Sequence, residues 1–403
     1  MTKRYCIFIT ALFCAFIGVF LVANAVSPDR TFSEVENRNL EQLPAVDFGT
    51  PEKLFRDGNF FNGQFMRDFE TYTTDQFIGR DAWVDLKART ERALGKKENN
   101  NVYFADNDTL ITRFDQPAAD RVTENLNYVN KFVENVDIPV VFSLIPTQAC
   151  IWADRLPEGA PNASQTDLMA QAQGAVTGAT WADVYTPLME HKDEDIFYRT
   201  DHHWTSLGAY YGYTGLASAL GYTPVPLTDY TPTVRSTEFY GTVFSSSGVR
   251  WVKPDTITTY VPDDGITVVS HTYDNSGNPV EEQRALYVES FLSVKDKYSM
   301  FLGGNQSLGV VTNTNNPDGP KLLIIRDSYA DSLVPFLTAH YSEIHLIDPC
   351  YYHLSVKDYV EQNGIDQALV LYSVPNFVTD GNMFWISMYA DPQTSFGDIV
   401  RRL

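Results

Sequence analysis

Three short, uninterrupted apolar runs constrain the fold of this chain more than any other feature of its sequence. They cover residues 138–145, 321–325 and 368–372, and each is rich in β-branched residues or leucine. Runs of this length without polar alternation are typical of central parallel strands that are buried on both faces. Segments with helical spacing lie between several of them, so we expect an α/β fold in which helices cover a parallel sheet.

The segments around these runs indicate the other elements. Residues 51–94 and 118–136 carry apolar and aromatic side chains at three- and four-residue spacing, which predicts one or two amphipathic helices and then another helix, with a strand at 102–104 between them. From about 225 to 298 the composition shifts to Thr, Val, Tyr, Gly and Pro, with turn signals at 263–265 and 274–277. This texture predicts a β-rich insertion within the sheet domain.

The first 26 residues predict export rather than fold. Lys3 and Arg4 precede an uncharged run over residues 5–26, which is long enough for a bilayer, since a span takes about 20 apolar residues. The run also ends in Ala23-Asn24-Ala25, a pattern typical of signal cleavage, so both a cleaved signal peptide and a retained anchor fit. Either way the basic end is expected to stay inside while the rest of the chain crosses the membrane. We therefore predict three parts: residues 1–26, a polar stalk over 27–50, and one domain over 51–403.

Charge and cysteine content exclude several classes of function. The net charge is −21, and it becomes −23 without the first 26 residues, which hold two cations and no acids. Such an acidic surface disfavours nucleic-acid binding through a broad electrostatic face. No Cys-x-x-Cys motif or Cys/His cluster occurs, so neither a structural zinc site nor a cofactor is predicted. Cys150 and Cys350, the two cysteines outside the apolar run, can close one disulfide or remain unpaired thiols.

The densest polar cluster lies at residues 198–206, directly before a helical pattern at 207–220. Thr205 or Ser206 can cap that helix, so the residues just before it are expected to be extended. In an extended segment Asp201 and His203 share one face, while His202 points to the other. A carboxylate beside an imidazole is the arrangement of a catalytic base with its orienting partner.

Two other interpretations of this cluster remain open. Asp201, His202 and His203 can be metal ligands, although adjacent histidines diverge on a strand and further ligands would be needed. Alternatively, the histidines only make structural hydrogen bonds at the start of the helix.

A second candidate lies where the apolar run 321–325 ends. Ser328 follows it after Asp327, and residues 333–339 continue with helical spacing. The serine is therefore expected at a strand-to-helix turn on the carboxyl edge of the sheet, where ligands of α/β proteins bind and free helix-opening N–H groups can stabilise an oxyanion. A mere helix cap is the alternative. Ser328, His203 and Asp201 together are the three parts of an acyl-transfer triad.

Several motifs together resemble the bacterial DHHW proteins, relatives of the SGNH-hydrolase-like alginate O-acetylation proteins. The resemblance runs from about Phe32 to about Leu371. It is carried by the segments 33–38 (Ser-Glu-Val-Glu-Asn-Arg), 75–77 with 80–81, 201–204 (Asp-His-His-Trp) and 326–328 (Arg-Asp-Ser).

The resemblance implies a three-layer, SGNH-hydrolase-like (flavodoxin-like) fold with a serine triad. Ser328 corresponds to the family nucleophile, and Asp201 with His203 to its Asp-x-His string. The Gly303-Gly304-Asn305 turn resembles the Gly and Asn elements of the family's oxyanion hole, with an ordinary turn as the alternative. Arg326 replaces the usual Gly, where it can close the backbone approach or bind an anionic group of the substrate.

These features lead to a functional hypothesis. We expect a membrane-anchored or secreted, extracytoplasmic O-acetyltransferase or acetylesterase that acts on an extracellular or cell-envelope polysaccharide, with an acyl donor as the second partner. The acidic exterior favours a neutral glycan, or one admitted through local cations such as Arg199 and Arg326. The alternatives are a catalytically silent glycan-binding or envelope-assembly protein of the same fold, and a metal-dependent hydrolase centred on Asp201 and His203.

Overall fold

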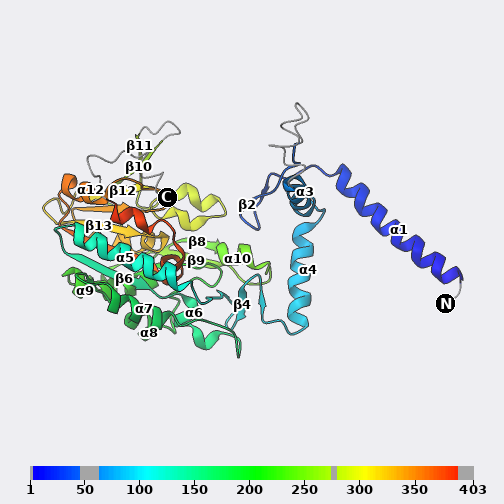
Figure 1. Cartoon of the computed structure of the whole chain (residues 1–403), viewed down its shortest axis with the longest axis horizontal. Helices are drawn as coiled ribbons and strands as arrows, with labels where there is room; N and C mark the ends of the chain where they lie inside the picture. The colour runs from blue at the N-terminus through cyan, green and yellow to red at the C-terminus, as the bar shows by residue number, and fades with distance from the viewer. Residues whose placement is uncertain (1–2, 46–62, 274–278, 389–403) are drawn as a thin grey trace. The chain divides into compact units, whose positions relative to one another are not determined.

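The computed structural model describes residues 3–45, 63–273 and 279–388, which form two compact units (Figure 1). Unit 1 comprises Met1–Asn100 and Phe244–Trp251, and unit 2 comprises Asn101–Val243 and Val252–Leu403. The boundaries predicted from the sequence, 1–26, 27–50 and 51–403, stay a prediction.

Unit 1 is built from helices joined by short strands. Its elements are α1 (Lys3–Val26), β1 (Phe32–Ser33), β2 (Arg38–Asn39), α3 (Gln64–Asp75), α4 (Arg80–Ala93) and β3 (Glu98–Asn99). Where the sequence predicted one or two amphipathic helices within 51–94, the structure has two, α3 and α4. The start of that segment and the end of the expected stalk fall at residues 46–62, outside the described residues.

Unit 2 is organised around a central sheet, which has eight strands within the described residues. Its order is β11-β10-β12-β14-β13-β15-β6-β7. The strands are β6 (Val140–Ile145), β7 (Thr180–Trp181), β10 (Ile266–Tyr273), β11 (Pro279–Arg284), β12 (Leu308–Asn313), β13 (Lys321–Arg326), β14 (Glu343–Ile347) and β15 (Gln367–Ser373). Neighbours from β14 to β7 pair in parallel, whereas β12, β10 and β11 pair antiparallel.

The three apolar runs became three adjacent strands at the centre of this sheet. They are β6, β13 and β15, and nearly every residue in them is buried. Burial on both faces explains why their sequences show no polar alternation. The α/β fold with a parallel sheet, predicted from these runs, is confirmed.

Helices cover the sheet in two groups (Figure 1). They are α5 (Ala119–Asn135), α6 (Gln148–Ile151), α7 (Gln165–Ala175), α8 (Tyr185–Glu190), α9 (Ser206–Leu220), α11 (Val334–Leu337), α12 (Val356–Asn363) and α13 (Val374–Thr379), with short 3₁₀ turns η1 (Ala153–Arg155), η2 (Leu227–Asp229), η3 (Glu289–Ser293), η4 (Lys297–Met300), η5 (Ser328–Ser332) and η6 (Met383–Ser387). Helix α5 packs against α13 and η6, and α12 also packs against η6, whereas α9 packs against α8 and α11. The grouping gives one helical layer on each side of the sheet.

The connections of the central strands create a switch point at the end of β13. The chain passes from β13 to β14 on one side, and then from β14 to β15 on the other side of β13. Right-handed crossovers in opposite directions place their helices, α11 and α12, on opposite faces. A crevice therefore opens at the carboxyl end of β13, which is where open α/β sheets bind ligands.

The β-rich insertion is partly continuous with the central sheet. Strands β8 (Thr233–Phe239) and β9 (Asp255–Thr259) pair with each other, and α10 (Thr242–Ser247) lies between them in sequence. Strands β10 and β11 instead extend the central sheet, because β10 pairs with β12. The predicted turn at 274–277 lies outside the described residues. Outside the sheet, β4 (Val102–Ala105) and β5 (Thr109–Thr112) form a hairpin.

Helix α9 approaches the segment before it unusually closely. Trp204 is fully buried, and a Cβ placed on Gly212 would lie 2.6 Å from its indole ring. A Cβ on Gly208 would lie 2.0 Å from the carbonyl oxygen of Ile196. These two glycines are therefore needed for space inside a helix, where glycine otherwise costs stability.

We predict that Gly212→Ala lowers the free energy of unfolding by about 1–3 kcal/mol, because the added methyl overpacks against a ring that cannot move. Gly174→Ala in α7, where a Cβ meets nothing within 4 Å, is the matched control, and it should be neutral or raise stability by up to about 1 kcal/mol. Urea unfolding of both variants measures the difference. Equal effects of the two substitutions would contradict the close approach.

Candidate active site

Ser328, His203 and Asp201 form a hydrogen-bonded chain. Ser328 Oγ lies 2.7 Å from His203 Nε2, and His203 Nδ1 lies 2.6 Å from Asp201 Oδ1. With the Nδ1 proton directed at the carboxylate, Nε2 is left as the acceptor for the serine hydroxyl. The structure thus brings together the three residues that the sequence nominated as a triad, from positions 125 residues apart.

Asp201 is buried as a hydrogen-bonded anion. Its Oδ1 accepts from the backbone N–H of His203, and its Oδ2 accepts from the backbone N–H and hydroxyl of Thr242 at 2.7 and 3.0 Å. Burial acts to raise the pKa of Asp201, but the adjacent His202 and His203 and these hydrogen bonds outweigh it and hold the pKa well below its usual range. Gly241 makes the contact possible, because a Cβ there would lie 2.2 Å from Asp201.

The segment that carries His203 is bent rather than extended. Residues Asp201, His202 and His203 form a bend, because the Asp201 side chain accepts the N–H two residues on and closes a local turn. The predicted alternation of side chains is therefore wrong for His202, whose ring lies 3.8 Å from that of His203. Its Nδ1 instead shares a 2.6 Å hydrogen bond with Thr242 Oγ1.

The same bend bears on the metal-site interpretation. One ligand atom from each of Asp201, His202 and His203 lies within 4.8 Å of the others, which is close enough to surround a cation. However, both ring nitrogens of His203 already have partners, Asp201 and Ser328. Burial and then His203 lower the pKa of His202, so its imidazole is neutral near pH 7. A metal role for these residues stays a prediction.

Tyr298 positions both the histidine and the serine. Its ring stacks on that of His203 with centroids 3.7 Å apart and planes inclined by 6°. Its hydroxyl donates to the carbonyl oxygen of Ser328 at 3.0 Å and lies 3.1 Å from Ser332 Oγ. Burial, and then Asp331, raise the pKa of Tyr298 well above its usual value, so the hydroxyl keeps its proton.

The Asp-His-His-Trp segment and the serine turn are also tied directly to each other. The indole N–H of Trp204 donates to the carbonyl oxygen of Tyr329 at 2.9 Å, and the Tyr329 hydroxyl donates to the carbonyl oxygen of His202. Gln148 holds the bend from behind, donating to the carbonyl oxygens of Tyr198 and Asp201. The distance between Ser328 and His203 is therefore set by several contacts of both backbones.

The serine turn begins with Asp327 as a cap. Its Oδ1 accepts the Tyr329 N–H, and its Oδ2 accepts from the N–H and hydroxyl of Ser373 and from Asn376. The helix expected at 333–339 is shorter than predicted: it comprises only the four residues of α11, with a proline in its first turn, and the 3₁₀ turn η5 precedes it. Among the described residues, the Ser328 N–H has no acceptor, so it is free to face an oxyanion.

A cavity of about 260 Å³ opens beside Ser328 at the carboxyl edge of the sheet. Three of the residues that line it lie at the carboxyl ends of neighbouring strands. Ser328 follows β13, Asp348 follows β14 and Tyr372 lies in β15. Asn305 and Asp380 complete this part of the wall. This is the crevice that the switch point creates.

The other predicted site residues divide into two groups. Asn305 lines the cavity, where its amide donates to Tyr351 at 3.2 Å, and Gly304 precedes it at a φ of 81° that favours glycine. Arg326 is fully buried and points to Asp331 at 3.1 Å, and Arg199 bonds to Asp255 and the carbonyl oxygen of Pro254. The structure brings neither arginine to the cavity.

Cys150 and Cys350 are both free thiols in the structure, so it does not contain the possible disulfide. Cys350 lies on the cavity wall between Asp348 and Asp380, and burial together with these acids raises the pKa of its thiol to about 12. The thiol is therefore protonated and is not a nucleophile near neutral pH.

Sequence reasoning missed Tyr298, Thr242, Asp348 and Tyr372. Tyr298 and Thr242 belong to the β-rich insertion, and nothing in the local sequence indicates that this insertion contacts the bend at residues 201–203. Tyr372, however, ends the predicted strand 368–372, and the rule that ligands bind at the carboxyl ends of parallel strands would have placed it near Ser328. Asp348 would have been found in the same way had the strand β14 been predicted.

A serine turn on the carboxyl edge of a mostly parallel sheet, with helices on both faces, defines an SGNH-hydrolase-like α/β protein, and the solved relatives agree. The structure of Bacillus cereus PatB1 with a sulfonyl adduct matches with a TM-score of 0.57 and 19% identity over 70% of this chain and 97% of that chain. At this identity the likeness supports the fold alone.

The family model described as "DHHW protein" matches residues 168–347, which confirms the predicted resemblance to this family. A DHHW family protein from Eubacterium siraeum matches with a TM-score of 0.62 and 27% identity, over 72% of this chain and 95% of that chain. The probable alginate O-acetylase AlgJ of Pseudomonas syringae pv. tomato is 26% identical over 161 residues, 37% of this chain. That match spans 40% of the relative's own length.

We predict that Asp201→Asn produces a pH-dependent loss of stability. The folded pKa of Asp201 lies below its unfolded value of about 3.9, so ionised Asp201 stabilises the fold fully above about pH 4 and this contribution is lost as pH falls further. Wild type should exceed the variant in free energy of unfolding by about 2–3 kcal/mol near pH 6, because asparagine keeps the shape but not the charge. The gap should shrink below about pH 4.

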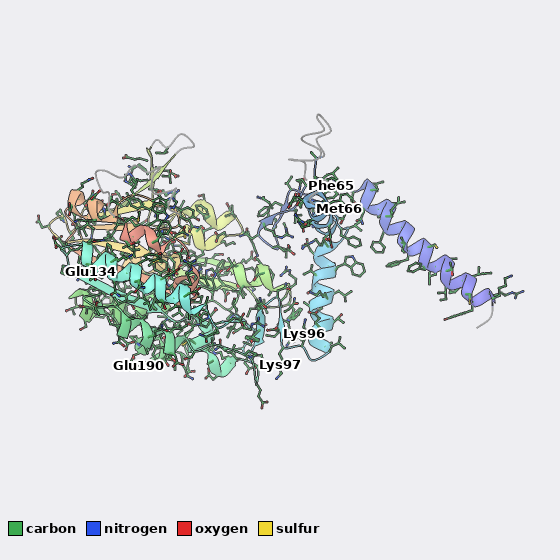
Figure 2. All side chains as sticks on the ribbon, in the orientation of Figure 1. Phe65, Met66, Lys96, Lys97, Glu134 and Glu190 are labelled. Carbon is green, nitrogen blue, oxygen red and sulfur yellow. The ribbon has the colours of Figure 1, made fainter. Side chains whose placement is uncertain are left out.

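Urea unfolding at a series of pH values measures this gap. Glu134→Gln, which removes one exposed acid from α5 (Figure 2), is the control and should change stability by less than about 0.5 kcal/mol throughout. A gap that stays constant down to about pH 3 would show that Asp201 is not held as a buried anion.

Proposed function

We propose that this protein is an extracytoplasmic, serine-dependent O-acyltransferase or esterase that acts on acetyl groups at hydroxyls of an extracellular or cell-envelope polysaccharide. The observation that carries the proposal is the 2.7 Å contact between Ser328 Oγ and His203 Nε2, with His203 oriented by buried Asp201. Nucleophile, base and orienting carboxylate within hydrogen-bond reach are the requirement for activating a serine.

The chemistry follows from the positions of these groups. Ser328 Oγ attacks the acetyl carbonyl while His203 Nε2 takes its proton, and Asp201 stabilises the resulting imidazolium. The Ser328 N–H and the Asn305 amide are the donors proposed for the oxyanion, with Gly304 allowing the turn that presents Asn305. His203 then protonates the leaving oxygen, and an acetyl-serine ester remains. A sugar hydroxyl or water resolves this ester by the same steps in reverse, which separates the transferase from the esterase.

The glycan substrate is supported by the relatives rather than by the site. The AlgJ relative is named as a probable alginate O-acetylase, and its similarity covers 37% of this chain. Because the match spans less than half of that relative, O-acetylation in general, and not alginate, is what we carry over. Arg326 is buried and Arg199 is bonded to Asp255, so none of the described residues that line the cavity is a cation for the carboxylates of an alginate-like polymer.

We further propose that α1 is retained as a membrane anchor of the exported domain. It is a 24-residue helix in which an 18-residue window has a mean hydropathy of 2.8, although a signal sequence would look the same. Its C-terminal end makes contacts that cleavage after Ala25 would remove. Phe20 stacks on Phe77 with centroids 5.6 Å apart, and the Ile78 N–H donates to Asn24 Oδ1 at 2.7 Å.

We predict that a sulfonyl fluoride labels Ser328 covalently in the full chain. Ser328→Ala should abolish labelling, and His203→Gln should slow it at least about 100-fold, because the base that activates the hydroxyl is lost. His202→Gln is the matched control: it keeps a hydrogen-bonding side chain beside Thr242 and should slow labelling by less than about tenfold. Intact-mass spectrometry follows the reaction.

Three outcomes would redirect the proposal. No labelling of wild type would favour a catalytically silent glycan-binding protein. Equal losses in the two histidine variants would contradict the assignment of His203 as the base. Activity that disappears with a chelator and returns with added metal would favour a metal-dependent hydrolase centred on Asp201 and His203.

For the anchor, we predict that the mature protein in cells keeps its N-terminal peptide and resists extraction from membranes by alkaline carbonate. Peptide mass spectrometry of the membrane fraction measures this directly. A mature chain that begins at Val26 and is recovered in soluble form would show that the segment is a cleaved signal peptide.

A further inference from the structure

The cavity beside Ser328 is acidic, and its charge has no counterpart on its wall. Three carboxylates line it, from Asp327, Asp348 and Asp380, while none of the described lining residues is Lys, Arg or His. Asp327 is saturated by its hydrogen bonds to Tyr329, Ser373 and Asn376. The two acids that remain to face a ligand are therefore Asp348 and Asp380.

Each of these two acids uses one oxygen to hold its own loop. Asp348 Oδ1 accepts the Cys350 N–H at 2.9 Å, and Asp380 Oδ1 accepts the Asn382 N–H at 2.7 Å. Arg326 is fully buried and pairs with Asp331; its charge acts on Asp348 from behind the wall, but its side chain does not line the cavity. The Cys350 thiol lies 4.0 Å from Asp380 Oδ2 and also hydrogen-bonds to Asp348. A thiol is a weak donor, so the second oxygen of each acid can still accept from a ligand.

An independent observation at the same cavity also indicates a ligand. Tyr372 lines the cavity, its side chain is 2% exposed, and its hydroxyl has no hydrogen-bond partner among the described residues. Buried phenol hydroxyls normally have a partner, so an unpaired one at a cavity wall calls for a group that enters the cavity. Asp380 and Asp348 are the charged groups that act most strongly on this hydroxyl.

We propose that Asp348, Asp380 and Tyr372 form a subsite for a protonated amine of the acceptor, so that the acceptor is a glycan with unacetylated amino sugars. A primary ammonium carries three N–H donors and no acceptor, which matches two carboxylates and one phenol oxygen. A buried and a partly buried acid in one cleft also attract cations and repel uronate carboxylates. The inference rests on the proposed function, because it identifies the acceptor for the acetyl-serine of Ser328.

The subsite fits the transfer step. With the ammonium held beside Ser328, a hydroxyl of the same or the adjacent sugar is presented to the acetyl-serine. Its oxygen attacks the acetyl carbonyl while His203 takes its proton; the bond to Ser328 Oγ breaks, and His203 returns the proton to Oγ. The products are an O-acetylated sugar and the regenerated hydroxyl of Ser328. The amine is protonated and carries no lone pair, so it does not compete as a nucleophile.

The test compares acceptors for the full chain in detergent at about pH 6, where sugar amines are protonated. A p-nitrophenyl acetate donor is offered with tetramers of glucosamine, N-acetylglucosamine, glucose or mannuronate, and base-labile acetyl ester on each is measured. We expect kcat/KM for the glucosamine tetramer to exceed that for the glucose tetramer about tenfold or more, mainly through KM, with mannuronate the poorest.

Three variants assign the preference to the subsite. Asp380→Asn and Asp348→Asn keep the oxygen that holds each loop but remove the charge, so the ratio between glucosamine and glucose tetramers should fall to about one to three. Tyr372→Phe should reduce it less. Glu134→Gln, which removes an exposed charge from α5 (Figure 2), should keep the wild-type ratio. Because the ratio is taken within each variant, a general loss of activity does not imitate the effect.

The outcomes separate the two proposals. If wild type is not labelled by a sulfonyl fluoride and transfers nothing, the proposed function fails. If it is active but prefers no acceptor, or prefers mannuronate, the amine subsite fails and the function stands. If water takes all of the acetyl, the same tetramers are compared as competitors of Ser328 labelling, and equal protection by all of them overturns the subsite.

Discussion

The arrangement of the site depends on one buried charge, the carboxylate of Asp201. Removing a carboxylate from water costs several kcal/mol even after relaxation, and the chain offsets this with donors from both neighbouring segments. Two come from His203 and two from Thr242. The hydrogen bonds to this anion bend the Asp-His-His-Trp segment and fix the orientation of the imidazole. They also tie the loop after β8 to Asp201. Gly241 follows from the same requirement, since any side chain there would collide with the carboxylate.

A second constraint joins this bend to the sheet. Trp204 fills the space above α9, which only glycines at 208 and 212 leave open, and its indole N–H holds the carbonyl oxygen of Tyr329. Tyr298 adds a contact from the opposite side through the carbonyl oxygen of Ser328. Because these hydrogen bonds go to the backbone of the serine turn, Ser328 and His203 are held in place by the surrounding structure as well as by their own contact. Preorganisation of this kind is what a serine triad needs.

The parts of this arrangement that could be predicted are those marked by a pattern in the local amino-acid sequence. Buried parallel strands are uniformly apolar, so the runs at 138–145, 321–325 and 368–372 predicted the centre of the sheet directly. Ser328 and His203 could be nominated because each belongs to a short string of unusual composition. The bend at Asp201 was not predictable from side-chain periodicity, because a side chain that hydrogen-bonds its own backbone replaces the strand geometry on which that periodicity rests. Arg326 shows the same limit: a charged residue next to the nucleophile suggested a substrate contact, whereas its direction along β13 takes it into the core toward Asp331.

The buried Arg326 also explains how the carboxyl edge of the central sheet can hold several carboxylates. Asp331, Asp348 and Asp327 all lie close enough to this guanidinium for it to stabilise their charge, and burial would otherwise raise the pKa of Asp331 and Asp348 further than it does. One buried cation behind the sheet edge thus keeps several carboxylates compatible with the fold. The charged residues that line the cavity, among those described, are all acids. The net charge of −21 is therefore not only a property of the surface. At the strand ends, Asp348 and Asp380 face the space beside Ser328, and on our proposal these two residues, which also close the loops after β14 and α13, select the acceptor.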